Sequence, residues 1–272
     1  MTTPENQLNL RARHPDFQTF LDFNESESKK VVKAYTCHLD ERYGTATLQT
    51  LDVFPAKKEN APILVFIHGG YWKALDKKSY RFIAAPYVEQ GMTVFLLNYR
   101  LIPTVIMQML LDDIRDGIDW IRSNAHQYKA DPDSLVVAGH SAGGHLALMA
   151  YLLNEHLRNS IKAICSLSGI FDLNVIRDSY LNADLQLKHS DVEAFSVSNK
   201  DLTLIDCPTL LSVGLDETDL FIEQSKALFK QNKAFAPLSY YEYPSLNHYQ
   251  IVHTLGQEGS PLTQFILKQA FS

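Results

Sequence analysis

Short, continuously apolar runs alternate along this chain with longer stretches of helical periodicity. The apolar runs predict buried strands at residues 63–67, 93–97, 135–138, 161–167 and 208–213, with more polar strands at 47–54 and 239–243. A strand that is apolar at successive positions is covered on both faces, because neighbouring side chains point to opposite sides of a sheet. Helical spacing recurs at 106–128, 142–157, 220–232 and, in broken form, 251–271. The alternation predicts an α/β fold with a mostly parallel, twisted sheet and helices on both faces.

The order of these elements also predicts the domain organisation. We expect residues 1–272 to form a single domain, since α/β sheets of this length are often one domain. The polar segment 1–30 predicts a helical or irregular N-terminal arm. The segment 173–204 is longer, polar and irregular, and it interrupts the alternation. Such an excursion over the edge of a sheet is typical of a lid or cap.

One turn carries a motif with a defined geometry. Residues 135–150 read LVVAGHSAGGHLALMA, an apolar strand followed by a tight turn and an apolar helix. Within it, GHSAG has the G-x-S-x-G pattern of a nucleophile elbow, which projects a serine from the carboxyl edge of a sheet. Side chains at Gly139 and Gly143 would collide with the neighbouring strand and helix. The sequence therefore favours a nucleophile elbow with Ser141 as the nucleophile over a plain glycine-rich turn. The strand, the elbow and the following helix together favour the α/β-hydrolase fold.

A second glycine-containing loop follows the first buried strand. The run ILVFI leads directly into HGGYW at residues 68–72. A loop in this place supplies backbone N–H donors to the oxyanion of a tetrahedral intermediate. We expect the N–H groups of Gly69, Gly70 and Ala142 to form this oxyanion hole. The alternative is that two glycines merely turn the chain after a strand.

A base and an acid are expected on the loops that follow the last two strands. His248 lies just after the run SYYEY, whereas His253 falls within a helical stretch. After PTLLSVG the chain continues with LDETD, which offers three carboxylates. The acid of this fold tends to fall three residues past the glycine, which favours Glu217, with Asp216 as its close rival. Asp219 is expected to cap the following helix.

Composition excludes several other classes of function. The chain has 31 acidic and 25 basic residues, a net charge of −6, and no clustered basic face, which argues against a nucleic-acid partner. Its three cysteines lie far apart and show neither disulfide nor zinc spacing. No signal peptide or membrane-spanning run is evident, so we expect a cytoplasmic protein with no membrane partner. The predicted chemistry requires no metal and no cofactor. Whether the chain forms a homodimer is left open.

Taken in order, HGGYW, GHSAGGHLAL, GLDETDLFIEQS and NHY resemble the kynurenine formamidase (arylformamidase) group of α/β hydrolases. The resemblance extends from about residue 50 to the segment NHYQIV. Tyr71-Trp72 fits the HGGxW form of that group, and His140 fits it better than the acidic residue common in lipase-like esterases. Aligning Phe221 and Gln224 with the family segment places the catalytic acid on Glu217, although eukaryotic members have an aspartate there.

The resemblance implies a serine hydrolase that cleaves N-formyl aryl amines, such as N-formyl-L-kynurenine, to formate and the free amine. Related hydrolases with the same motifs act on esters, so a carboxylesterase or thioesterase is the alternative. A binding protein on a hydrolase scaffold is a third, since fold alone does not fix function. Tyr71, Trp72, His140 and Arg100 are candidate residues of the substrate pocket. Tyr71 and Trp72 could equally be core aromatics, and Arg100 could instead be a structural ion-pair partner.

Overall fold

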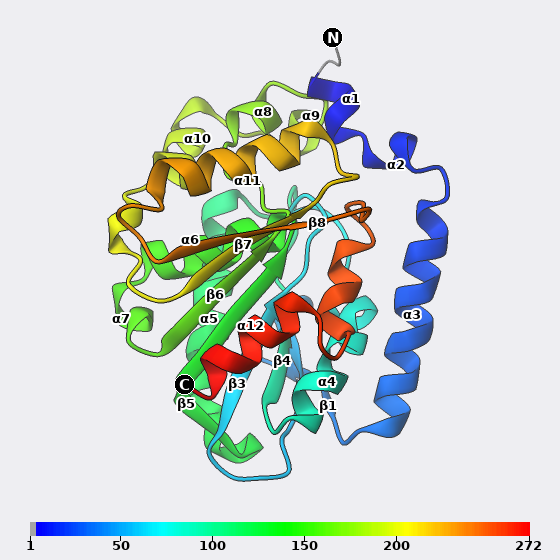
Figure 1. The fold of residues 1–272 in the computed structure, drawn as a ribbon, viewed down its shortest axis with the longest axis vertical. Coiled ribbons are helices and arrows are strands. Elements are labelled where there is room, and N and C mark those ends of the chain that lie inside the picture. The colour runs from blue at the N-terminus through cyan, green and yellow to red at the C-terminus, as the bar shows by residue number, and fades with distance from the viewer. Residues whose placement is uncertain (1–3) are drawn as a thin grey trace.

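A computed structural model describes residues 4–272 and places eight strands in one sheet (Figure 1). The sheet order is β1-β2-β4-β3-β5-β6-β7-β8, with β1, β2 and β4 paired antiparallel and all other pairs parallel. The strands are β1 (His38–Arg42), β2 (Thr50–Phe54), β3 (Ala61–Ile67), β4 (Thr93–Leu97), β5 (Ala130–His140), β6 (Ile161–Leu167), β7 (Thr209–Gly214) and β8 (Leu238–Tyr243). The fold prediction is confirmed. The strand β1 was not predicted, because its sequence HLDER is polar and largely exposed.

Helices cover both faces of this sheet. The α-helices are α1 (Pro4–Leu8), α2 (Leu10–Arg13), α3 (Phe17–Ala34), α4 (Ala84–Glu89), α5 (Met107–Asn124), α6 (Ala142–Leu153), α7 (Glu155–Arg158), α8 (Asn174–Arg177), α9 (Asn182–Leu185), α10 (His189–Phe195), α11 (Asp219–Asn232) and α12 (Pro261–Ala270). Short 3₁₀ helices are η1 (Lys77–Ile83), η2 (Ala125–Tyr128), η3 (Val197–Asn199), η4 (Leu202–Leu204) and η5 (Ile251–Gly256). None of the described helices is long and apolar enough to cross a membrane.

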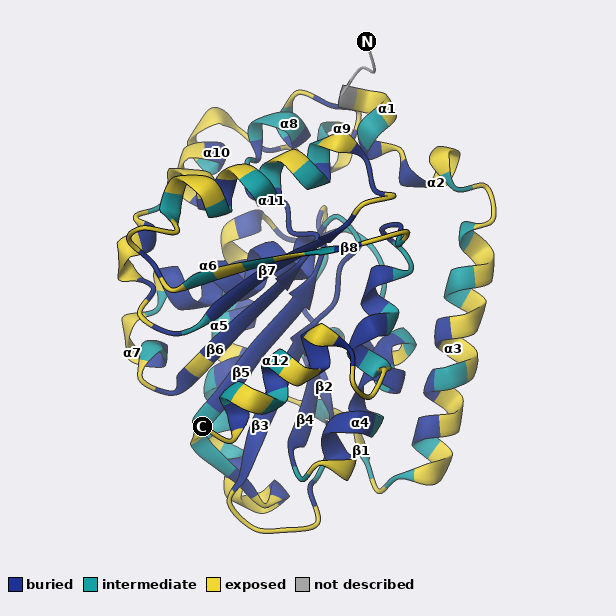
Figure 2. Cartoon of the chain, in the orientation of Figure 1, coloured by how far each residue is buried: buried dark blue, intermediate teal, exposed yellow. Residues whose placement is uncertain are grey.

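Alternate residues of β3 divide the core into two layers. Ile63, Val65 and Ile67 face the layer that contains α5, α6 and α11, whereas Leu64 and Phe66 face the layer that contains α4 and α12. Figure 1 shows α4 and α12 in front of the sheet and α6 behind it. The strands β3, β4 and β7 are buried along their whole length, while outer helices such as α3 and α11 keep one exposed face (Figure 2). This two-sided burial explains why the central strands are continuously apolar.

The broken helical pattern near the C-terminus is two separate elements. The 3₁₀ helix η5 ends at Gly256, and α12 begins at Pro261 after Ser260. The Ser260 hydroxyl accepts a hydrogen bond from the Thr263 N–H at 3.1 Å, which caps the new helix. Proline suits the first helical position because no intrahelical partner exists there for an N–H group.

Strand order decides where loops from different strands can meet. The connection after β3 crosses one face of the sheet to β4, and β5 pairs with β3 on the other side, with Ile67 opposite Gly139. Neighbouring parallel strands whose connections diverge leave a crevice at their carboxyl ends, where ligands of open α/β sheets bind. The loop after β3 and the turn after β5 therefore face each other at one edge.

The N-terminal arm and the 173–204 excursion both pack near this edge. The arm consists of α1, α2 and α3, and α3 contacts η1. The excursion contains α8, α9 and α10, and its side chains Ile176, Leu185 and Val192 are buried in the main core cluster. Figure 1 shows α1, α8 and α9 together at the same end of the molecule.

A buried ion pair fixes β2 to η1. The carboxylate of Asp52 is fully buried and lies 3.0 Å from Lys77 Nζ and 2.6 Å from Arg81 Nε. Lys77 is itself 2% exposed, with a second carboxylate from Asp40 at 2.5 Å. One buried cation, Lys77, and one partly buried cation, Arg81, share this buried carboxylate, so removing its charge leaves them only partly compensated.

We predict that Asp52→Asn lowers the free energy of unfolding by about 3 kcal/mol, the usual effect of breaking a buried ion pair. Urea unfolding followed by circular dichroism measures the change. The control is Glu25→Gln, which breaks a pair with Lys29 whose side chains are 60% and 69% exposed. That variant should lose less than about 1 kcal/mol. Equal losses in the two variants would contradict the prediction.

Candidate active site

Ser141 lies at a sharp turn between β5 and α6. Its backbone has φ 58° and ψ −121°, a conformation rarely adopted by a residue with a side chain. A Cβ at Gly139 would lie 2.0 Å from the Gly143 carbonyl oxygen, and one at Gly143 would lie 2.0 Å from the Ile67 carbonyl oxygen. Only glycine permits these contacts. The Ser141 N–H donates to the Leu167 carbonyl at 2.8 Å, which ties the turn to the end of β6.

His248 is held by a buried carboxylate. Its Nδ1 lies 2.6 Å from Glu217 Oε2, and the carboxylate is fully buried. The other carboxylate oxygen, Oε1, accepts the Gly214 N–H at 2.8 Å and the Ser168 hydroxyl. Because the two oxygens have separate partners, the carboxylate has a fixed orientation. The neighbouring Asp216 is exposed to solvent and makes no contact of this kind.

The hydroxyl and the imidazole face the same pocket. Ser141 and His248 both line it, and the His248 ring lies 4.7 Å from the ring of His140, the residue before the serine. The Phe221 ring also packs against His248, with the ring centres 4.3 Å apart. No hydrogen bond joins Ser141 to His248 among the residues from 4 to 272. In enzymes without substrate such bonds are often loose and tighten on binding. With Nδ1 occupied by Glu217, Nε2 is the ring nitrogen left for the serine.

The loop after β3 approaches the serine closely. A Cβ at Gly69 would lie 3.0 Å from Ser141 Cβ and 2.8 Å from the His140 carbonyl oxygen. Gly70 has φ +106°, and its carbonyl accepts the N–H groups of Lys73 and Ala74 at 3.0 Å in a tight turn. Gly69 thus brings the backbone of this loop against Ser141, Gly70 lines the same pocket, and Ala142 follows the serine at the start of α6.

His68 holds this loop in place and remains neutral. Its ring is stacked against Tyr99 at 4.5 Å and more distantly against Tyr80 at 6.2 Å. Burial lowers the pKa of His68 to about 4. A carbonyl can only accept, so the 2.8 Å contact of His68 Nδ1 with the Gly69 carbonyl oxygen places the proton on Nδ1. The Tyr99 hydroxyl donates to the His68 carbonyl at 2.9 Å.

Two of the four predicted pocket residues line the pocket. Tyr71 and His140 do so, but Trp72 and Arg100 are not among its lining residues. Trp72 is fully buried and packs edge-on against His145 at 5.2 Å, so it is a core aromatic. Of the two interpretations of Arg100, the structure supports the structural ion-pair partner and not the pocket residue.

Arg100 instead completes a buried ion pair. Its Nε and Nη2 atoms donate to the Asp113 carboxylate at 2.8 and 2.6 Å. Asp113 is fully buried and also accepts the Arg100 backbone N–H at 2.9 Å and the Gln49 side-chain amide at 2.8 Å. A buried carboxylate requires such compensation, which accounts for the position of the arginine.

The N-cap of α11 also differs from the prediction that Asp219 caps this helix. Thr218 rather than Asp219 is the N-cap residue, and it makes no side-chain cap bond. The side chain of Gln7, from α1, accepts the Leu220 N–H at 2.7 Å instead. A residue more than two hundred positions away therefore satisfies a donor of the first helical turn.

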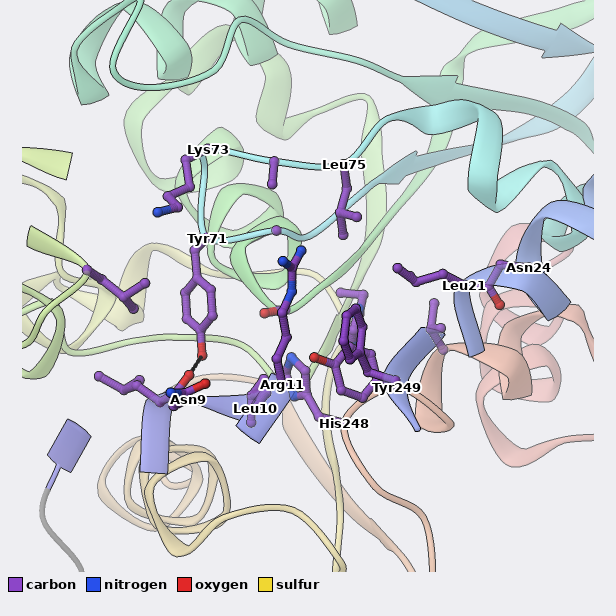
Figure 3. A pocket seen from close by; sticks show the side chains of 18 of the residues that line it. Asn9, Leu10, Arg11, Leu21, Asn24, Tyr71, Lys73, Leu75, His248 and Tyr249 are labelled. Atoms are coloured by element: carbon purple, nitrogen blue, oxygen red, sulfur yellow. Dashed lines mark hydrogen bonds between the residues drawn. The ribbon is translucent and has the colours of Figure 1, made fainter. Parts of the chain in front are cut away.

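The N-terminal arm forms a wall of the pocket that sequence reasoning missed. The pocket has a volume of about 440 Å³. Leu8, Arg11, Phe17 and Leu21 from the arm line it, together with Tyr180 from the 173–204 excursion. Figure 3 shows Arg11 between Tyr71 and Tyr249. The amphipathic pattern of the arm was the available signal, but it does not state which surface the arm covers.

Sheet, serine turn and histidine–carboxylate pair together define a class. The chain is a hydrolase of the α/β-hydrolase fold. It belongs to the BD-FAE family, which matches residues 51–230.

Individual relatives include formamidases and esterases. A kynurenine formamidase of Danio rerio is 28% identical over 240 residues, covering 85% of this chain and 80% of that protein. Esterase LipQ of Mycobacterium tuberculosis is 25% identical over 220 residues, covering 72% and 52%. The crystal structure of a Silicibacter protein, provisionally described as a thioesterase, has a TM-score of 0.87 and 21% identity, covering 98% and 99%. The resemblance to the kynurenine formamidase group is confirmed, and the structural likeness shows the fold.

The buried histidines beside the site predict how stability depends on pH. Burial lowers the pKa of His68 and of His145 to about 4. Between about 6.5 and 4 the unfolded chain therefore binds more protons at these residues than the folded chain, so stability falls as the pH falls through this window. Each histidine should contribute a loss of about 2 kcal/mol between pH 7 and pH 5.

The variant His145→Gln tests this effect. Its amide can still donate to the Phe195 carbonyl, which His145 Nε2 contacts at 2.7 Å, but it does not titrate. Urea unfolding at pH 7 and pH 5 should show a loss about 2 kcal/mol smaller than in the unaltered protein. The same pH dependence in both proteins would contradict the assignment of a neutral, buried histidine.

Proposed function

We propose that Ser141 is the nucleophile, His248 its base and Glu217 the acid that orients the base. The observation that carries this proposal is the bonded pair of His248 and Glu217, whose histidine lines the same pocket as the strained serine. A carboxylate on Nδ1 holds the imidazole in the tautomer whose Nε2 can accept a proton, and it stabilises the imidazolium that follows. A non-catalytic scaffold would not need to retain this arrangement.

The reaction proceeds through an acyl-enzyme. His248 Nε2 takes the Ser141 proton while the serine oxygen attacks the carbonyl carbon of the substrate. The negative oxygen of the tetrahedral intermediate accepts hydrogen bonds from the N–H groups of Gly69, Gly70 and Ala142. His248 then gives the proton to the departing nitrogen or oxygen, and the carbon–leaving-group bond breaks. A water molecule, deprotonated by His248, releases the acyl group and regenerates the serine.

We further propose that the substrate is an N-formyl aryl amine, such as N-formyl-L-kynurenine, giving formate and the free amine. Kynurenine formamidases of two fish and one insect align with most of this chain. The pocket also suits an aromatic leaving group, since Phe17, Tyr71, Tyr80 and Tyr249 line it. Aromatic side chains favour flat aromatic ligands in offset or edge-on contact.

Ester or thioester hydrolysis is the second candidate function. It is supported by the similarity to esterase LipQ and to the structure provisionally described as a thioesterase. The same serine chemistry serves both classes, so the leaving group distinguishes them.

A substrate panel tests the proposed function. We expect kcat/KM for N-formylkynurenine to exceed that for short p-nitrophenyl esters, because the aromatic walls contact the aryl leaving group. The variant Ser141→Ala should lower both activities by at least about a thousandfold, because it removes the nucleophile. Higher kcat/KM for the esters would favour the second candidate. Full activity of Ser141→Ala would exclude both.

The choice of acid makes a separate prediction. Glu217→Gln removes the charge that stabilises the imidazolium, so kcat should fall about a thousandfold or more. Asp216→Asn is the matched control, because it neutralises the adjacent, exposed carboxylate and should leave kcat near the original value. Thermal unfolding of both variants checks that the fold is intact. A large loss in Asp216→Asn with full activity in Glu217→Gln would reverse the assignment.

A further inference from the structure

The side chains that line the pocket have an unusual charge balance. Although the chain has a net charge of −6, no aspartate or glutamate lines the pocket among the described residues. Two cationic residues, Arg11 and Lys73, do line it. The pocket is therefore more positive than the protein as a whole, which favours a negatively charged ligand.

Only one of these two cations is free of a carboxylate. Lys73 Nζ forms an ion pair with Asp184 of the 173–204 excursion. Arg11 takes part in no ion pair or side-chain hydrogen bond within residues 4–272. Its guanidinium carbon lies 5.0 Å from the centre of the Phe17 ring. A guanidinium over an aromatic face keeps its planar set of donors available at the edge.

The guanidinium lies among the aromatic walls of the pocket. Figure 3 shows the Arg11 side chain extending from the arm between Tyr71 and Tyr249. The Arg11 charge also acts on Tyr249 and on Tyr180, another residue of the pocket. Burial raises the pKa of Tyr249 to about 12 and also raises the pKa of Tyr180, and the positive charge of Arg11 opposes the rise in both. Arg11 therefore faces the space that a substrate would fill.

The backbone on both sides of Arg11 is anchored. The Leu8 carbonyl accepts the Tyr71 hydroxyl at 2.9 Å, and the Leu10 side chain is buried in the core. The Asn9 side chain accepts the Ala12 N–H at 3.2 Å and caps α2. Anchoring fixes the backbone from which the Arg11 side chain extends, so less backbone entropy is lost when the guanidinium binds a ligand.

We propose that Arg11 binds a carboxylate on the leaving group of the substrate and thereby selects anionic aryl substrates. This inference rests on the proposed function of the same site. An arginine can bind a carboxylate through two parallel N–H···O hydrogen bonds, which gives both affinity and orientation. Arg11 is a specificity-determining residue that takes no part in proton transfer.

Two matched pairs of substrates test the proposal. The first pair consists of aryl formamides with an ortho-keto side chain that ends either in a carboxylate or in a carboxamide. The second pair consists of the corresponding aryl acetates with the same two side chains. Within each pair only the charge differs, so the ratio of kcat/KM between anion and amide measures selectivity for the carboxylate.

We expect the unaltered protein to prefer the anion in the pair or pairs that it hydrolyses. Arg11→Gln should lower the ratio about tenfold, mainly through KM, since a charge-assisted contact at a partly exposed site is worth about that factor. Arg11→Lys should restore part of the ratio. Arg13→Gln is the matched control from the same helix, outside the pocket, and should leave the ratio unchanged. The preference should also weaken as salt is added.

The outcomes separate this inference from the proposed function. Hydrolysis of the acetates alone, with an anion preference that depends on Arg11, would reject the formamidase and retain the carboxylate site. Hydrolysis of the formamides with equal kcat/KM for anion and amide would retain the formamidase and overturn the carboxylate site. If Arg11→Gln lowers kcat/KM equally for the anion and the amide, the ratio stays the same. That result would show a structural effect on the arm and would also overturn the carboxylate site.

Discussion

The site depends on close contact between backbone segments at the end of β5. Gly139, Gly143 and Gly69 bring the turn, the first residues of α6 and the loop after β3 to distances that no Cβ could tolerate. At this turn Ser141 has a positive φ of 58°, a strained conformation that the surrounding close contacts hold in place. Its side chain then emerges where β3 and β5 end side by side. Every other group of the site is positioned relative to this turn.

The contacts of Glu217 show how a glutamate fits at this position. The longer side chain of Glu217 reaches back so that Oε1 meets the Gly214 N–H while Oε2 meets His248. Gly214 has no side chain, and a Cβ there would lie 2.0 Å from the Leu246 carbonyl oxygen and 3.3 Å from Glu217 Oε1. The loop that follows β7 and the loop that carries His248 thus meet through this glycine. The position of the Glu217 carboxylate and the close contact at Gly214 therefore depend on each other.

The sequence predicted well what depends on local pattern. Buried parallel strands have a continuous apolar signal, and the serine turn has glycines at fixed spacing, so both were located from the chain alone. The spacing from Gly214 to Glu217 also identified the carboxylate that contacts His248. Trp72 and Arg100 were the difficult cases, because a tryptophan or arginine near a site looks the same in sequence whether it faces the pocket or the core. For Arg100 the answer lies in Asp113, a partner thirteen positions away whose burial only the fold reveals.

The N-terminal arm illustrates a limit of a different kind. No local pattern states which surface a polar, amphipathic segment will cover, yet this arm contacts two functional loops at once. The Thr218 hydroxyl, next to Glu217, donates to the Gln7 carbonyl at 3.1 Å, and the Tyr71 hydroxyl, next to Gly70, donates to the Leu8 carbonyl at 2.9 Å. Adjacent residues of α1 therefore join the acid loop to the loop after β3. Because the same arm also lines the pocket, the pocket wall and the loop that carries Glu217 are held by one segment of the chain.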